Sequence, residues 1–219
     1  MITPLQLQPG QGLCRQDGLP GSLGLAVRDR HSDRIGLLSC WHVLATPQGR
    51  EGDLIHRHSA HPYPVRREPI ATLARWFLDD EGDAAVAWLL PGVTIATELS
   101  ELPLILTNHR APQVGDILVK VGAQTGCTRA RVTNIGHHPA SYGHTQLTMA
   151  GFYLEPISQP KQCALISAPG DSGAIWCDEL SGAAVGLHVG GECRPHFGPI
   201  HAKACTINRV LQRLEVDLL

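Results

Sequence analysis

A short turn in the second half of the sequence combines an acid, a hydroxyl and two glycines. Residues 167–176 read SAPGDSGAIW, in which a GDSG turn presents Ser172. A serine hydroxyl is a weak nucleophile near neutral pH and needs an adjacent general base, which itself needs an orienting partner. The N–H groups of Gly170 and Ser172 are candidate donors to a developing oxyanion, because glycine permits close approach of a substrate. On the turn alone, an ordinary connection between strands remains an equal interpretation.

Candidates for the base and its orienting acid lie in the first half of the sequence. His42 lies in LLSCWHVLA, just after an apolar run, where a loop can direct the imidazole into a cleft. Asp83 begins the apolar run DAAVAWLL, where a carboxylate can be buried at the mouth of a strand. Asp79, Asp80 and Glu81 are competing acids, although their sequence is typical of a solvated turn.

The elements that must position these side chains are short. Apolar runs punctuated by Gly, Pro, Asp and Asn recur along the 219 residues, which favours an all-β sandwich or barrel. The runs are 21–29, 34–40, 71–78, 83–90, 116–122, 129–136, 145–155, 162–167, 173–177 and 183–189. Residues 91–116 are bounded by proline and connect two halves of about 100 residues each.

One helical pattern closes the chain. Ile207, Val210, Leu211 and Leu214 follow the i, i+3, i+4, i+7 spacing, and Thr206 is the candidate N-cap. His137, His138 and His144 have the surroundings of turn residues, whereas Cys127, Cys163 and Cys177 are expected to be buried strand thiols.

Composition narrows the class of protein. With 18 basic and 20 acidic residues the net charge is −2, so no basic surplus points to nucleic acid. The N-terminus lacks the pattern of a signal peptide, and the most apolar stretch, AAVAWLLPGVTIA, is too short to span a bilayer. Seven cysteines, an odd number without an export signal, favour reduced thiols. We therefore expect a soluble, cytoplasmic protein with no nucleic-acid or membrane partner.

The order His42, Asp83, Ser172 and the motifs around these residues resemble the chymotrypsin-fold (trypsin-like) serine peptidases, in particular bacterial intracellular members. The resemblance rests on CWH followed by V-L, on DAAVA and on GDSGA, and it extends to GSLGLAVRD, LVKVGAQTGCTRARVTNIG and AVGLHVGG. It implies two perpendicular six-stranded antiparallel β-barrels with a C-terminal helix. Residues 1–105 would form the first barrel and residues 106–219 the second.

The resemblance also implies a serine endopeptidase that works through an acyl-enzyme without a cofactor. His42 would take the proton of Ser172 and return it to the leaving amine, while Asp83 fixes the imidazole tautomer. Gly170 and Ser172 would supply the oxyanion hole. The expected partner is a protein or peptide substrate, and a regulatory partner or fused module is left open. The alternative is a chymotrypsin-fold domain that binds peptides or partners without turnover.

The sequence departs from the animal members of this family in two ways. Val43 stands where they have a cysteine after the catalytic histidine, and Cys40 lies two residues before it instead. There is also no R/K-I-V-G-G stretch near the start, whose released amine in zymogens pairs with the acid that is Asp171 here. Asp171 therefore needs another partner, and activation by N-terminal clipping is not expected.

Substrate preference is suggested by the strand AVGLHVGGE (184–192). It is similar to the G-x-H-x-G-G strand of glutamyl endopeptidases and of picornaviral chymotrypsin-fold cysteine proteases, whose histidine donates to a Glu or Gln side chain. His188 would have this role, assisted by Ser167, five residues before Ser172. Ile166 occupies the position of the acid that gives trypsin its preference for Lys and Arg, so no such preference is expected. The alternative is that His188 is a strand histidine satisfied by local partners.

A further cluster has the residue types of a zinc site. Its members follow C-x2-H-x4-H-x3-C and are Cys193, His196, His201 and Cys205. The family places a strand through HAKACTI that would bury Cys205 among alanines, so we expect no metal. A zinc-stabilised interaction module remains the second alternative.

Overall fold

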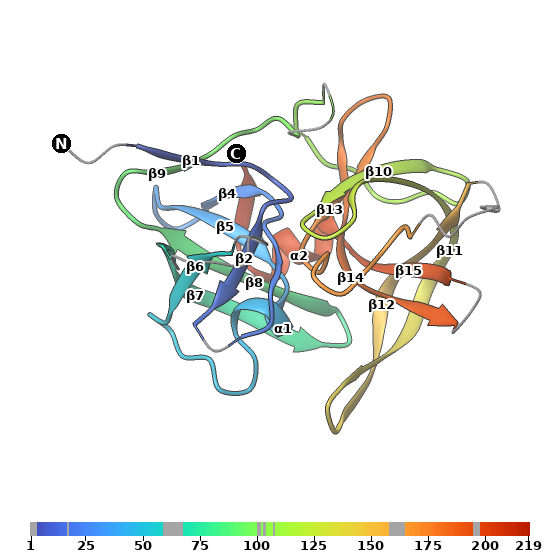
Figure 1. Cartoon of the computed structure of the whole chain (residues 1–219), viewed down its shortest axis with the longest axis horizontal. Helices are drawn as coiled ribbons and strands as arrows, with labels where there is room; N and C mark the ends of the chain where they lie inside the picture. The colour runs from blue at the N-terminus through green and yellow to red at the C-terminus, as the bar shows by residue number, and fades with distance from the viewer. Residues whose placement is uncertain are drawn as a thin grey trace.

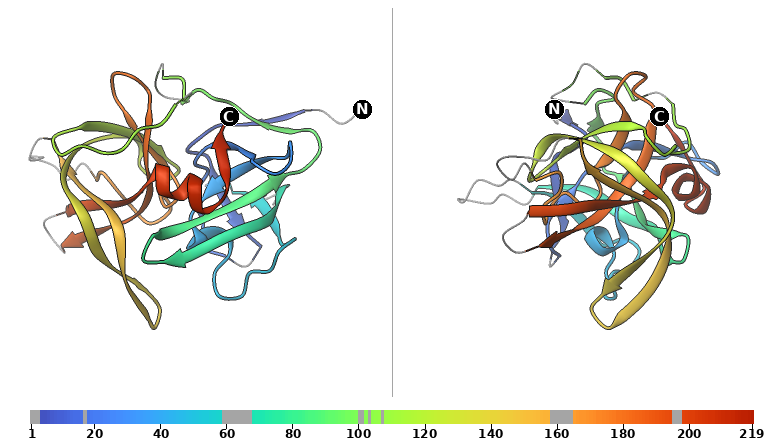
Figure 2. Two further views of the ribbon diagram at one scale, coloured as in Figure 1. Left: turned by 180° about the vertical axis from the view of Figure 1, so that it is seen from behind. Right: turned by 90° about the vertical axis from the view of Figure 1, so that its right-hand side faces the viewer.

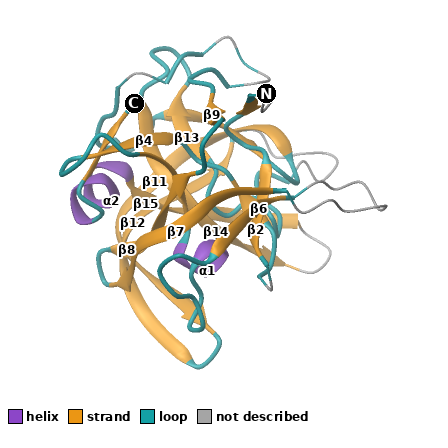
Figure 3. Ribbon diagram, turned by 90° about the vertical axis from the view of Figure 1, so that its left-hand side faces the viewer, coloured by secondary structure: helices purple, strands orange, loops and turns teal. Residues whose placement is uncertain are grey.

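The computed structural model describes residues 4–16, 18–58, 68–99, 102, 104–106, 108–157, 165–194 and 198–219, without the side chains of 192–194 and 198–200. Strands dominate it (Figure 3), and two curled sheets lie side by side with the C-terminal helix at their junction (Figures 1 and 2). The expected all-β class, the two curled sheets of a two-barrel fold and the C-terminal helix are confirmed. The first sheet differs from the expectation of six strands, because it has eight and only the second sheet is a closed six-stranded barrel. Neither helix in the described part is long and apolar enough to cross a membrane.

The first sheet holds eight strands in the order β16-β4-β5-β8-β7-β6-β2-β3, each antiparallel to its neighbours. Their bounds are β2 Gly12–Arg15, β3 Gly21–Ser22, β4 Ala26–Asp29, β5 Ile35–Ser39, β6 Leu54–Arg57, β7 Pro69–Asp79, β8 Gly82–Leu89 and β16 Val216–Leu218. A one-turn helix, α1 (Trp41–Leu44), follows β5. Beside this sheet, β1 (Leu5–Leu7) pairs in parallel with β9 (Val93–Ile95).

The second sheet is a closed six-stranded barrel in the order β10-β11-β12-β15-β14-β13. Its strands are β10 Ile117–Gly122, β11 Gly126–Tyr142, β12 Thr145–Pro156, β13 Ile175–Asp178, β14 Ala184–Arg194 and β15 Gly198–Thr206. The larger hydrophobic cluster includes Leu38 and Val86 of the first sheet together with Leu187 of the barrel, so one core joins the two sheets. A smaller cluster, with Phe152 and Trp176, lies within the barrel.

The chain end crosses back to the first sheet. Helix α2 (Ile207–Arg213) begins after Thr206, as the helical pattern predicts, although the Thr206 side chain makes no cap hydrogen bond. The helix is shorter than the pattern, since Glu215 takes a left-handed conformation and β16 then pairs with β4. The second half of the chain thus adds one strand to the first sheet, and the division at residues 105/106 stays a prediction.

The β11–β12 hairpin is the longest in the barrel and projects well beyond it (Figures 1 and 2). Its strands have 17 and 12 residues and remain paired up to Tyr142 and Thr145. The expectation of a turn at His137 and His138 is wrong, because both lie within β11 and only His144 lies in the turn.

The cysteine expectations have mixed outcomes. Cys177 is a buried strand thiol as expected. Cys127 also lies in a strand, but it is exposed because it pairs at the outer end of β11, next to the β10–β11 turn. Cys163 lies outside the described residues.

Candidate active site

Asp83 and His42 form a hydrogen-bonded pair at one end of the first sheet. Asp83 is the second residue of β8 and is fully buried. Its Oδ1 accepts the backbone N–H of His42 at 3.3 Å, and its Oδ2 is bonded to His42 Nδ1. Burial lowers the pKa of His42, but the charge and hydrogen bond of Asp83 outweigh burial and raise that pKa above its ordinary value. With Nδ1 donating to Asp83, His42 Nε2 is the nitrogen left to accept a proton.

The competing acids at the β7–β8 turn are used elsewhere. Asp79 pairs with Arg213 at 2.6 Å and Glu81 pairs with Arg209 at 2.7 Å, both toward α2. Asp79 and Glu81 therefore anchor the helix to the turn, and within the described residues none of the three competing acids, Asp80 included, is hydrogen-bonded to His42.

A third group completes the surroundings of Asp83 and was missed from the sequence. The hydroxyl of Tyr142 donates to Asp83 Oδ2 at 2.7 Å. Tyr142 ends β11, and its neighbourhood of Gly, Pro and His residues gives no sign of a long strand. Its position therefore follows from tertiary structure.

The backbone N–H groups of the GDSG turn differ in whether they already have a hydrogen-bond acceptor. Gly170 and Gly173 have φ of 107° and 96°, a left-handed conformation that favours glycine. The N–H groups of Asp171 and Gly173 are bonded, to Ala168 O and His188 O. The N–H groups of Gly170 and Ser172 have no hydrogen-bond acceptor among the described residues. These are the two groups expected to bind an oxyanion.

The Ser172 hydroxyl is not bonded to His42. Its Oγ donates weakly to the Val189 carbonyl oxygen at 3.5 Å. The segments that carry His42 and Ser172 nevertheless both pack against Gly21. A Cβ atom added at Gly21 would lie 2.5 Å from Val43 Cγ2 and 2.8 Å from the Ser172 carbonyl oxygen. Gly21 is thus packed between the residue after His42 and the serine itself.

A shared carbonyl also joins the two segments. The His188 oxygen accepts the Cys40 thiol at 3.2 Å and the Gly173 N–H at 2.8 Å. Cys40 lies two residues before His42, and Gly173 directly follows Ser172. The β5–α1 connection and the GDSG turn are therefore fixed relative to each other through β14.

Asp171 has an internal partner. Lys120 of β10 and Asp171 are both fully buried, and Lys120 Nζ lies 2.9 Å from Asp171 Oδ2. Oδ2 also accepts the Thr125 hydroxyl at 2.6 Å, and Oδ1 accepts the N–H groups of Gln124 and Thr125 at 3.0 and 3.1 Å. Burial alone raises the pKa of Asp171, but Lys120 and these hydrogen bonds outweigh it and hold that pKa below its ordinary value. A lysine of the barrel thus takes the place that the sequence left open.

His188 and Ser167 are in contact, as expected. His188 is fully buried, and its Nε2 lies 2.9 Å from Ser167 Oγ. Trp176 Nε1–H donates to His188 Nδ1 at 3.2 Å, so the proton of the neutral ring resides on Nε2. Burial, followed by the charge of Lys120, lowers the pKa of His188 to about 3. The ring is a neutral donor. Ile166, which directly precedes Ser167 in the sequence, is also buried.

Comparison with known proteins bears on the fold. No protein-family model and no curated protein matches the sequence. Similar solved structures include Thermobifida fusca Protease A (TM-score 0.72, 17% identity, 98% of both chains) and Cellulomonas bogoriensis chymotrypsin (TM-score 0.71, 19% identity, 98% of this chain and 99% of that one). The chain has the chymotrypsin fold. Another structure with the chymotrypsin fold, a glutamic acid specific serine protease that utilizes a histidine triad in substrate binding, is 15% identical (TM-score 0.70, 97% of this chain and 100% of that one).

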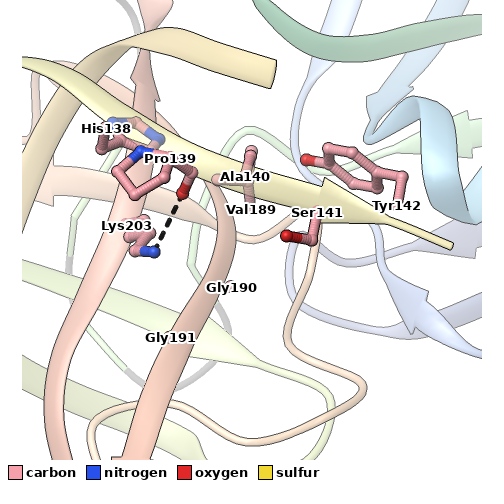
Figure 4. A pocket seen from close by; sticks show the side chains of 9 residues that line it. All are labelled: His138, Pro139, Ala140, Ser141, Tyr142, Val189, Gly190, Gly191 and Lys203. Carbon is pink, nitrogen blue, oxygen red and sulfur yellow. Dashed lines mark hydrogen bonds between the residues drawn. The ribbon is translucent and has the colours of Figure 1, made fainter. Parts of the chain in front are cut away.

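In this chymotrypsin fold a cavity of about 320 Å³ lies between the β11–β12 hairpin and β14. Residues 138–142 and 189–191 line it, with Lys203 at one end and Tyr142 at the other (Figure 4). At the Lys203 end of the cavity, Lys203 Nζ donates a hydrogen bond to the Pro139 carbonyl oxygen at 3.1 Å. The cavity adjoins the candidate nucleophile, because the Val189 carbonyl accepts the Ser172 hydroxyl.

Metal ligation has little support in the described residues. Cys40, His42 and Asp83 are the one described group whose ligand atoms lie within 4.8 Å of one another, and they are already bonded as donors and acceptors. The zinc hypothesis is not tested, because His196 and the side chain of Cys193 lie outside the described residues. His201 and Cys205 are described, and the Cys205 thiol is buried beside Gly82.

Proposed function

We propose that the protein is a serine endopeptidase in which His42, Asp83 and Ser172 form the catalytic triad. The observation that carries the proposal is the pairing of His42 with a buried Asp83 next to a GDSG turn whose two expected oxyanion donors are unbonded. The solved proteases with the same fold support this activity. Catalytic hydrogen bonds are often long before substrate binds, so the Ser172–Val189 contact is compatible with it.

The chemistry follows from the protonation states. The Ser172 hydroxyl turns from Val189 O to His42 Nε2, which accepts its proton as Oγ attacks the peptide carbonyl. The oxyanion is bound by the N–H groups of Gly170 and Ser172. As the C–N bond breaks, His42 gives this proton to the leaving amine. Water then deacylates the serine by the reverse proton route, while Asp83 stabilises the imidazolium throughout.

We also propose that the site is competent without N-terminal clipping. In zymogens the turn acid awaits a released amine, whereas here Lys120 is covalently part of β10 and already pairs with Asp171. The ion pair also fixes the position of Asp171, the residue between Gly170 and Ser172, whose N–H groups are the proposed oxyanion donors. The oxyanion hole is therefore preformed in the intact chain.

The substrate class we propose is a peptide with Glu or Gln before the scissile bond. His188 Nε2–H donates to Ser167 Oγ, which leaves the Ser167 hydroxyl to donate to a substrate side-chain oxygen, and an apolar side chain would leave that hydroxyl unpaired. The similar glutamic acid specific protease, which uses histidine in substrate binding, supports the proposal. Here the side chains bonded to His188 are Trp176 and Ser167.

A proteome-derived peptide library tests both parts of this proposal. The wild-type protein is expected to cleave after Gln and Glu, and Ser172→Ala is expected to cleave nothing. Cleavage after Arg or Leu would refute the pocket assignment alone. Retention of peptides without any cleavage by the wild-type protein would favour the binding-module alternative.

A further inference from the structure

The carboxylate of Asp83 receives one hydrogen bond that no catalytic residue supplies. Two of its bonds come from His42, one from the backbone and one from the ring. The third is the hydroxyl of Tyr142, which binds the same oxygen as the ring nitrogen. Since a buried carboxylate with few donors binds a proton more readily, the third donor bears directly on the His42–Asp83 pair.

We propose that Tyr142 is a positioning residue that the second barrel supplies to the His42–Asp83 pair of the first sheet, an inference that rests on the proposed function. The ring covers the pair as well as bonding to it. Its centroid lies 5.6 Å from the His42 ring and 5.9 Å from the Trp41 ring, the latter in an edge-on arrangement. Any movement of Tyr142 therefore changes both the hydrogen bonding and the packing of the imidazole.

The hairpin that carries Tyr142 is anchored to the strand turn that carries Asp83. Ala150 of β12 donates its backbone N–H to the Asp80 carbonyl at 2.8 Å. Asp80 lies in the β7–β8 turn, three residues before Asp83. The projecting hairpin in Figures 1 and 2 is thus held against the first sheet where the acid lies. Two independent bonds, one backbone and one side-chain, join the barrel to this corner.

The thiols, the phenol and the second imidazole around the pair are neutral at physiological pH, while Asp79 and Glu81 of the nearby turn are paired with arginines of α2. Burial raises the pKa of the Cys40 thiol well above its ordinary value and that of Cys205, from β15, to about 12. His188, from β14, is held neutral by burial, and burial also raises the pKa of Tyr142. Within the described residues, the side chains that bond to the Asp83 carboxylate are therefore those of His42 and Tyr142.

Tyr142→Phe tests the inference, because it removes the hydroxyl and keeps the ring. The deprotonated pair, with its anionic Asp83, loses a donor, while the protonated pair loses less. The titration of the His42 ring, followed by NMR, is therefore expected to move upward by about 0.5 to 1 pH unit. The acid limb of kcat/KM is expected to move by the same amount. Tyr153→Phe, in β12 of the same barrel, is the matched control and is expected to leave both titrations unchanged.

Two results would overturn the inference: an unchanged His42 titration in Tyr142→Phe, or an equal shift in Tyr153→Phe. A loss of thermal stability without a titration shift would likewise mean that Tyr142 only packs the hairpin. The NMR titration does not require turnover. A shift seen in a protein that hydrolyses nothing would therefore refute the proposed function while supporting the contact.

Discussion

The candidate site holds two histidines, the partly exposed His42 and the fully buried His188, whose environments shift their pKa values in opposite directions. His42 faces a buried carboxylate, and its pKa is raised. His188 faces a hydroxyl and an indole N–H, lies near the charge of Lys120, and has a pKa of about 3. In both rings Nδ1 has a fixed partner, Asp83 for His42 and Trp176 for His188, so both tautomers are defined.

The opposite pKa shifts suit the two histidines to different tasks, His42 to proton transfer and His188 to substrate recognition. A ring paired with an anion can gain a proton and lose it again at little cost, which suits a general base. A ring that stays neutral throughout the physiological range donates its one N–H in a constant direction, here to Ser167 Oγ, and so orients a hydroxyl that suits recognition of a substrate oxygen. The partner of each ring nitrogen therefore decides what that histidine can do.

The largest expected effect comes from removing His42, the histidine that we propose transfers the proton. His42→Ala should lower kcat/KM by about 10⁴-fold or more for every peptide, because the triad acts as a unit. His109→Ala, an exposed histidine bonded to Asn208, is the control and should be near wild type. Steady-state kinetics on a Gln and a Glu peptide measure both variants. A His42→Ala enzyme with near-normal rates would contradict the assignment of the base.

The next effect concerns the buried ion pair behind the GDSG turn. Lys120→Met leaves Asp171 buried without its charge partner and should lower the free energy of unfolding by about 3 to 5 kcal/mol. Since the folded pKa of Asp171 lies below its unfolded value, its contribution is full above about pH 4 and is lost as pH falls through the folded pKa. Urea unfolding between pH 2 and 7 should therefore show less acid dependence in Lys120→Met.

Arg129→Met is the control for this ion pair, because its partner Glu179 lies at the surface. Little change in stability is expected there. Equal destabilisation by the two variants would show that burial of the Lys120–Asp171 pair has no special importance.

A smaller effect tests the recognition side. His188→Ala should lower kcat/KM for a Gln peptide by about 10²-fold, because it removes the ring that orients the Ser167 hydroxyl in the proposed substrate contact. The rate of covalent modification at Ser172 by a small reagent should change little, since no pocket contact is needed. If His188→Ala abolishes both, the residue supports the fold rather than selecting substrates.

The smallest effect is the shape of the pH profile. The acid limb of kcat/KM should fit one ionisation, with a pKa above 6.5, because only His42 of the two rings titrates near neutrality. His188, at about 3, should add no second ionisation in that range. A profile that needs two neutral-range ionisations on the acid side would mean that the His188 ring takes up a proton.

The parts of the site that could be predicted from the sequence are those defined by local pattern. His42 follows an apolar strand and Asp83 lies at the start of another, and two glycines flank the acid and the serine of the GDSG turn. Lys120 and Tyr142 reach their partners across 51 and 59 residues of sequence, so tertiary packing decides their roles. Lys120 did leave a sign, a single cation within the apolar run DILVKVG. Tyr142 left none, since Pro139 indicates a turn where the strand in fact continues to Tyr142.

The central claim is that the Ser172 hydroxyl is activated by His42, and covalent labelling tests it most directly. A fluorophosphonate probe, followed by peptide mapping, should modify the wild-type protein at Ser172 alone. Labelling should vanish in Ser172→Ala and fall steeply in His42→Ala and Asp83→Ala. An unlabelled wild-type protein, or labelling that persists unchanged without His42, would contradict the account.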